Sequence, residues 1–178
     1  MTAQMGDIIT YKGRRHTMAS EPQIIAPAAK FFDIRFIPPH TACWRGYLAE
    51  WAVNKDKLFL KSIQGKAEVT DLEAWRSERL ALRKRLKQGE ISPQENGHLL
   101  KEHYKRLTTE RKVDLTFLFG SSEPVHATWI TGIIRIPTGN IIRYVHMDYF
   151  SEYDRNLFLS FKDGMLLSAR EEEFGKSD

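Results

Sequence analysis

The sequence predicts an α+β fold: an antiparallel β-hairpin scaffold with one inserted antiparallel helical hairpin. Before residue 70 and after residue 112, apolar and polar residues alternate between turn residues, which is typical of hairpins. From 70 to 112 the apolar residues recur about every 3.6 positions, which is the period of a helix. A chain of 178 residues is long enough for one domain with its own core. We therefore expect a single domain over 1–178, with 70–112 as a helical-hairpin insertion.

Several strands are predicted before residue 70. One covers 7–11, and another covers 31–37 and ends at two prolines, which cannot continue a strand. The most regular alternation covers 44–53 and is followed by turn residues at 54–56 and a returning apolar run over 58–63. These last two runs are expected to form a β-hairpin.

Two helices are predicted between 70 and 112. Thr70 and Glu73 have the spacing of a capping box, and so do Ser92 and Glu95, with a proline between them at the first helical position. A glycine before the second box suits the end of the first helix. Each helix has one apolar side, formed by Leu72, Trp75, Leu82 and Leu86 in the first and by Leu99, Leu100, Tyr104 and Leu107 in the second.

The strand pattern resumes after residue 112. We expect a strand over 113–119, then a long strand over 125–136 that pairs with 141–147 across a Pro-Thr-Gly-Asn turn. A last hairpin joins 156–161 to 165–169 through an Asp-Gly turn, which is among the strongest short-range hairpin signals.

Composition and the chain ends point to a soluble cytoplasmic protein. Cys43 is the single cysteine, so no internal disulfide can form, and no run approaches the roughly 20 apolar residues that span a bilayer. The first ten residues lack the pattern of a signal peptide, and the acidic tail over 170–178 is expected to fray. We expect no membrane partner.

The positive charge is concentrated on one segment. Residues 70–112 carry 11 basic and 7 acidic residues out of 27 and 23 in the whole chain, so this segment accounts for the entire net charge of +4. Clusters of this kind can bind phosphates or an acidic protein surface. The alternative is that cations near a helix C-terminus merely stabilise the helix dipole. The candidate binding residues are Arg83, Lys84, Arg85 and Lys87.

Two short motifs resemble known proteins. The run Trp44-Arg45-Gly46-Tyr47 with its returning strand, and a later Trp129-x-x-Gly132, are similar to a pattern in small uncharacterised bacterial proteins. The stretch 86–95 resembles the turn of short helical-hairpin modules at bacterial protein ends. Neither resemblance implies an activity or a catalytic residue.

Dedicated catalytic and metal-binding motifs are absent from the sequence, so no cofactor and no metal are expected. Weak catalytic candidates are His126, His146 and Asp148, of which the last two would share one face of a strand. If strand ends converged, these residues and His40 could form an acid–base or metal site. Otherwise each histidine is an ordinary edge residue.

Cys43 and Arg45 carry two further alternatives. Cys43 lies near His40 and could be a nucleophile, although a buried cysteine more often packs as a small apolar group. Arg45 is expected to share one face of a strand with Tyr47 and Trp51, so its guanidinium could bind a ligand's carboxylate or phosphate, or form an internal cation–π contact or ion pair.

These observations lead us to expect a non-enzymatic bacterial interaction protein, of the adaptor or accessory type, that uses the basic helical arm to bind an acidic protein partner. One alternative is a nucleic-acid-binding accessory protein that uses the same arm. The other is a small enzyme or ligand binder centred on Arg45, His126, His146 and Asp148.

Overall fold

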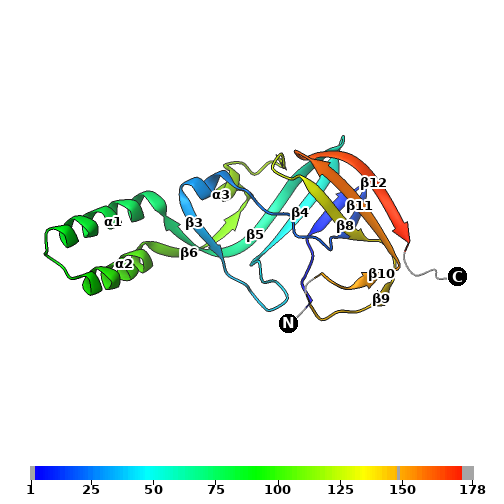
Figure 1. The fold of residues 1–178 in the computed structure, drawn as a ribbon. Helices are drawn as coiled ribbons and strands as arrows, with labels where there is room; N and C mark the ends of the chain where they lie inside the picture. The colour runs from blue at the N-terminus through cyan, green and yellow to red at the C-terminus, as the bar shows by residue number, and fades with distance from the viewer. Residues whose placement is uncertain (1–2, 148, 174–178) are drawn as a thin grey trace.

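The computed structural model describes residues 3–147 and 149–173, and it confirms a mixed α+β fold that consists mostly of one large sheet (Figure 1). The sheet has the strand order β2-β1-β4-β5-β12-β11-β8, and β3, β6 and β7 also pair with β5. The pairs are antiparallel except for β1 and β4, which run parallel. The strands of the N-terminal part are β1 (Ile8–Tyr11), β2 (Arg14–Thr17), β3 (Phe32–Phe36), β4 (Tyr47–Asn54) and β5 (Lys57–Asp71).

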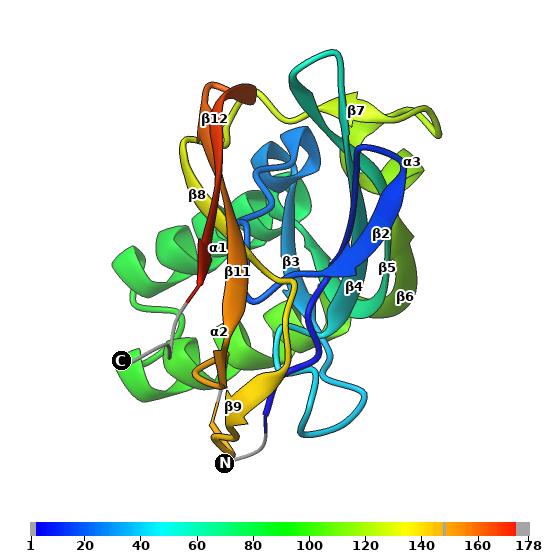
Figure 2. The same cartoon turned by 90° about the vertical axis from the view of Figure 1, so that its right-hand side faces the viewer.

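The C-terminal strands complete the sheet and curl it on itself (Figure 2). Strand β2, at one end of the strand order, contacts β8 at the other end, and the amide of Ala19 donates to the carbonyl of Arg135 at 2.8 Å. The core therefore lies inside a nearly closed sheet. The remaining strands are β6 (Thr108–Asp114), β7 (Val125–His126), β8 (Gly132–Pro137), β9 (Ile141–Arg143), β10 (Glu152–Tyr153), β11 (Arg155–Lys162) and β12 (Met165–Glu173).

The two hairpins with the strongest turn signals are confirmed. Strands β4 and β5 pair around a turn in which Lys55 and Asp56 have φ of 48° and 58°. Strands β11 and β12 pair around Asp163 and Gly164, with φ of 49° and 73°. Positive φ at both central residues gives the turn a twist that matches the flanking strands. Local turn chemistry therefore sets both registers.

Strand β5 leads directly into helix α1 (Leu72–Lys87), and helix α2 (Pro93–Leu107) leads directly into β6. The two helices pack against each other and extend beyond the sheet (Figure 1). Ser92 caps α2 as predicted, because its hydroxyl accepts from the Glu95 amide at 3.1 Å.

The predicted cap of α1 at Thr70 is wrong. Asp71 caps the helix instead, because its carboxylate accepts from the amides of Glu73 and Ala74 at 2.8 and 2.9 Å. Thr70 is buried in the sheet and is hydrogen-bonded to the hydroxyl of Thr108 at 2.7 Å.

Three predictions for the C-terminal half are also wrong. The stretch 113–119 is the end of β6 followed by helix α3 (Leu115–Phe119), because the Asp114 carboxylate caps the Phe117 amide at 2.9 Å. The stretch 125–136 is divided between β7 and β8, and β8 pairs with β11. Strand β9 pairs with β10 and not with β8.

Two further segments are partly regular. A short 3₁₀ helix covers Pro27–Lys30. Strand β12 continues to Glu173, so the prediction of fraying is wrong for 170–173, while 174–178 lie outside the described residues.

Gly46, just before β4, lies closely against the chain at Phe36. Its φ is +76°, and a β-carbon added there would lie 2.7 Å from Cβ of Phe36. Gly89, in the turn between the helices, has a similar φ of +72° but no atom within 4 Å of an added β-carbon. Alanine substitutions at these two glycines therefore distinguish the cost of backbone strain from the cost of a steric clash.

We expect Gly46→Ala to lower the free energy of unfolding by about 2–4 kcal/mol, because left-handed backbone strain and overpacking both contribute. Gly89→Ala should lower it by only about 1 kcal/mol, from strain alone. Urea denaturation of both variants measures the difference. Equal losses would mean that Phe36 moves away at little cost.

Candidate functional site

The outward face of α1 presents basic side chains around an exposed leucine. Arg76, Leu80, Arg83, Lys84 and Lys87 recur at spacings of three and four, so they share one face of the helix. All five are exposed, and Leu80 retains 71% of its accessible surface. None of the four cations forms an ion pair with any residue in 3–147 or 149–173. We call these five residues the basic face.

Three of the predicted binding residues, Arg83, Lys84 and Lys87, lie on the basic face, whereas Arg85 does not. Its guanidinium contacts Glu90 in the turn between the helices, 3.4 Å away. Arg76 was missed as a candidate, although its spacing from Leu80 and Arg83 was visible in the sequence.

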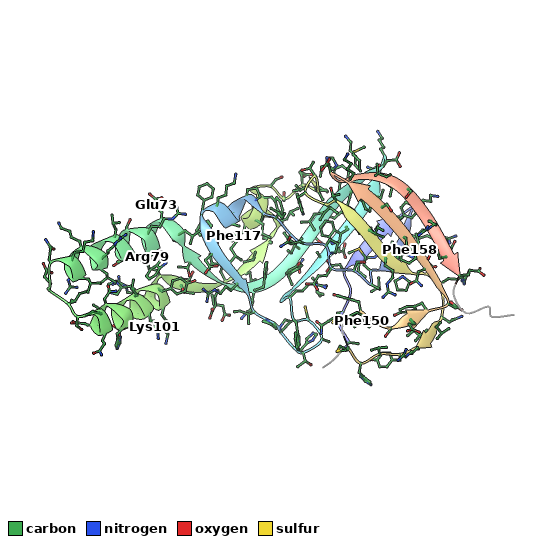
Figure 3. The ribbon with its side chains drawn as sticks, viewed as in Figure 1. Glu73, Arg79, Lys101, Phe117, Phe150 and Phe158 are labelled. Carbon is green, nitrogen blue, oxygen red and sulfur yellow. The ribbon has the colours of Figure 1, made fainter. Side chains whose placement is uncertain are left out.

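The inward face of α1 is occupied by contacts with α2. Glu78 accepts from Arg106 and is bonded to the His103 ring, both at 2.7 Å. Trp75 meets Tyr104 edge-on, with ring centroids 5.2 Å apart. In Figure 3, Glu73 lies on the side of α1 away from α2. The helix pair is therefore held together from within, and its outer sides remain exposed.

Tyr104 fastens the base of the helix pair to β3. Its hydroxyl donates to the carboxylate of Asp33 and accepts from Arg35 at 2.8 Å. Arg35 also bonds to Asp33 at 3.0 Å. Burial, together with the bond to Asp33, raises the pKa of the Tyr104 phenol. Tyr104 is thus used inside the molecule, and of the apolar residues on the helices Leu80 is the most exposed.

Arg45 lies in a buried ion pair with Asp7. The distance between its guanidinium and the carboxylate is 2.6 Å, and the two side chains are 5% and 0% exposed. The same carboxylate accepts from the Ala49 amide at 2.9 Å and from the Trp51 indole at 3.0 Å. Both oxygens of the carboxylate are thereby hydrogen-bonded within the core.

Two tyrosines complete the surroundings of Arg45. Its guanidinium lies 5.4 Å from the Tyr47 ring centroid, donates to the Tyr47 carbonyl at 3.0 Å and donates to the Tyr149 hydroxyl. Burial raises the pKa of Tyr149 to about 12 and also raises the pKa of Tyr47. Both phenols therefore stay protonated at neutral pH and cannot serve as bases there.

Burial is the largest influence on the Asp7 carboxyl and raises its pKa. Arg45, the Trp51 indole and the Ala49 amide act in the opposite direction and lower the pKa. Asp7 was missed in the sequence because it precedes Arg45 by 38 residues and meets it only through the parallel pairing of β1 with β4.

The remaining candidates lie apart. His126, on β7, packs its ring against Phe59 near the start of β5, and the two ring centroids are 5.5 Å apart. Arg45 lies near a later part of β5, towards the C-terminal end of that strand. His146 meets the ring of Tyr144 at 4.6 Å. Asp148 lies outside the described residues.

Cys43 is buried, and its thiol lies 3.3 Å from the Tyr47 carbonyl, whereas His40 is exposed. Among the described residues, no group of three or more His, Cys, Asp and Glu side chains could hold a metal ion. The predicted absence of a metal and of a cofactor stays a prediction.

No protein-family model, no curated protein and no solved structure matches the chain. No helix in the described part of the chain is long and apolar enough to cross a membrane.

Proposed function

We propose that the protein is a non-enzymatic interaction protein whose helix pair is an antiparallel hairpin, inserted between β5 and β6, that binds an acidic surface of a partner protein. The observation that carries this proposal is the basic face: four exposed cations, which form no ion pair within the described part of the chain, surround an exposed leucine. The four cations of such a face complement the charge of an acidic protein surface, and the leucine supplies an apolar contact.

The connection to the sheet supports the reading of the helix pair as an arm. Thr70 and Thr108 are register partners, so the β5–β6 ladder is already closed where the helices begin. The helices therefore need not form for β5 and β6 to pair. A segment of this kind can be kept for binding while the sheet supplies the stability.

Leu80 favours a protein partner over a nucleic acid. Phosphate binding depends on cations and gains little from an aliphatic side chain. On a protein surface, burying a leucine contributes about 1.5–3 kcal/mol. A leucine that is 71% exposed among four cations is therefore better matched to an acidic surface that also carries apolar residues.

The test is binding of a labelled acidic helical peptide that contains leucine, measured by fluorescence anisotropy. Arg83→Gln/Lys84→Gln should weaken binding by tenfold or more, because each charge-assisted contact is worth about 1.5–3 kcal/mol. Leu80→Ala should weaken binding of this peptide but not of oligoglutamate, which offers no apolar contact. Thermal stability should barely change in either variant.

Two controls accompany this test. Lys101→Gln/Lys105→Gln removes the same charge from α2, and in Figure 3 Lys101 lies on the side of α2 away from α1, so binding should be retained. An armless protein, with a short turn joining Asp71 to Thr108, should fold and fail to bind. Tighter binding of single-stranded DNA, unaffected by Leu80→Ala, would contradict the proposal and favour nucleic acid.

A further inference from the structure

A cavity of about 780 Å³ lies on the outer face of the sheet, away from the basic face. Strands β1, β4, β5 and β6 form its floor, and residues of the segment 37–43 form a wall. Its lining is largely apolar and includes the exposed side chains of Met5 and Leu48 as well as Ile8 and Ile37. The volume is in the range of pockets that hold small ligands.

Two lysines face this cavity side by side. Lys66 on β5 and Lys112 on β6 are direct register partners in an antiparallel pair, and both line the cavity. Like charges directly opposite each other destabilise a sheet. Arrangements that break a local rule in this way are expected at functional sites.

Lys112 has no counter-ion among residues 3–147 and 149–173. Lys66 donates to Glu110 at 2.6 Å, whereas Lys112 forms no ion pair with any residue of the described chain. The two carboxylates that line the cavity are engaged elsewhere. Glu50 pairs with Arg15 at 2.8 Å, and Asp114 accepts from the Phe117 amide at 2.9 Å.

We propose that this cavity binds a small amphiphilic anion. The apolar body of the ligand packs against Met5, Ile8 and Leu48, and its anionic head accepts a hydrogen bond from the ammonium of Lys112. An anion placed there would also relieve the repulsion between Lys112 and Lys66. The ammonium of Lys112 favours an anionic head over a cationic one at this position.

Isothermal titration calorimetry with decanoate, decyl phosphate and decanol, each below its micelle-forming concentration, tests this site. At least one of the two anions should bind tenfold or more tightly than decanol, and their order identifies a carboxylate or a phosphate head. Lys112→Gln should weaken that binding by tenfold or more. Its melting temperature should stay the same or rise, because a cross-strand repulsion is removed.

Lys162→Gln serves as the matched control, because this exposed lysine lies outside the cavity lining. The affinity of this variant for the two anions should equal that of the parent protein. Lys112→Arg, which keeps the charge, should retain most of the affinity. The proposal is overturned if decanol binds as tightly as the anions, if Lys112→Gln binds like the parent, or if none of the probes gives a saturable heat.

Discussion

Replacing Arg45 by methionine is expected to lower the free energy of unfolding by about 3–5 kcal/mol, because the substitution leaves the Asp7 carboxylate charged, buried and without its counter-ion. Methionine fills a similar length of space, so lost packing makes a small contribution. Urea denaturation followed by tryptophan fluorescence measures the loss directly.

The loss should depend on pH. Burial already raises the pKa of Asp7, and removing Arg45 removes an influence that lowers it. A carboxyl whose pKa is higher in the folded than in the unfolded state binds protons more tightly when folded. The Arg45→Met variant should therefore regain stability as the pH falls from neutral towards the ordinary value of 3.8.

Two comparisons show whether the buried charge is responsible. Adding Asp7→Asn to Arg45→Met should recover part of the lost stability, because an amide carries no charge. Arg15→Met breaks the exposed pair with Glu50 and should cost less than about 1 kcal/mol. A double variant less stable than Arg45→Met alone would contradict this account.

The hairpins that sequence reasoning identified are those specified by their own turns. Lys55 and Asp56 adopt positive φ, as does the Asp-Gly pair before Met165, and each turn determines the pairing of its flanking strands within a few residues. The cap at Ser92 is local in the same sense. Short-range chemistry of this kind can be read from one sequence.

The failed predictions have two causes, namely strand partners that are distant in sequence and a local helix cap within an apolar run. The apolar pattern over 125–136 does not reveal that β8 pairs with β11 rather than with β9. The stretch 115–119 consists of residues that suit a strand, yet the Asp114 cap makes it helical. Tertiary packing and a single side-chain hydrogen bond decide these cases.

The basic face, the partner of Arg45 and the cavity differ in how far the sequence reveals them. The basic face follows from helical spacing, so the sequence predicts most of its residues. The partner of Arg45 depends on the parallel pairing of β1 with β4, for which the sequence has no local signal. The cavity with Lys66 and Lys112 depends equally on the β5–β6 register.

Trp51 is the residue whose truncation should be as costly as the loss of Arg45. Its side chain is fully buried on β4, and its indole donates to Asp7 at 3.0 Å. Trp51→Ala should lower the free energy of unfolding by about 3–5 kcal/mol, through lost burial and the cavity that remains. Denaturant unfolding monitored by circular dichroism measures this loss without relying on the tryptophan signal.

Trp51→Phe separates the hydrogen bond from the packing. Phenylalanine keeps most of the apolar volume but cannot donate to Asp7, so we expect a loss of about 1–3 kcal/mol from the unsatisfied carboxylate oxygen. Trp44→Ala is the matched control, because Trp44 is 59% exposed and should change stability by no more than about 0.5 kcal/mol. If Trp51→Phe were as unstable as Trp51→Ala, the hydrogen bond to Asp7 would outweigh the packing of the indole, and the explanation of the Trp51→Ala loss by burial and cavity formation would be contradicted.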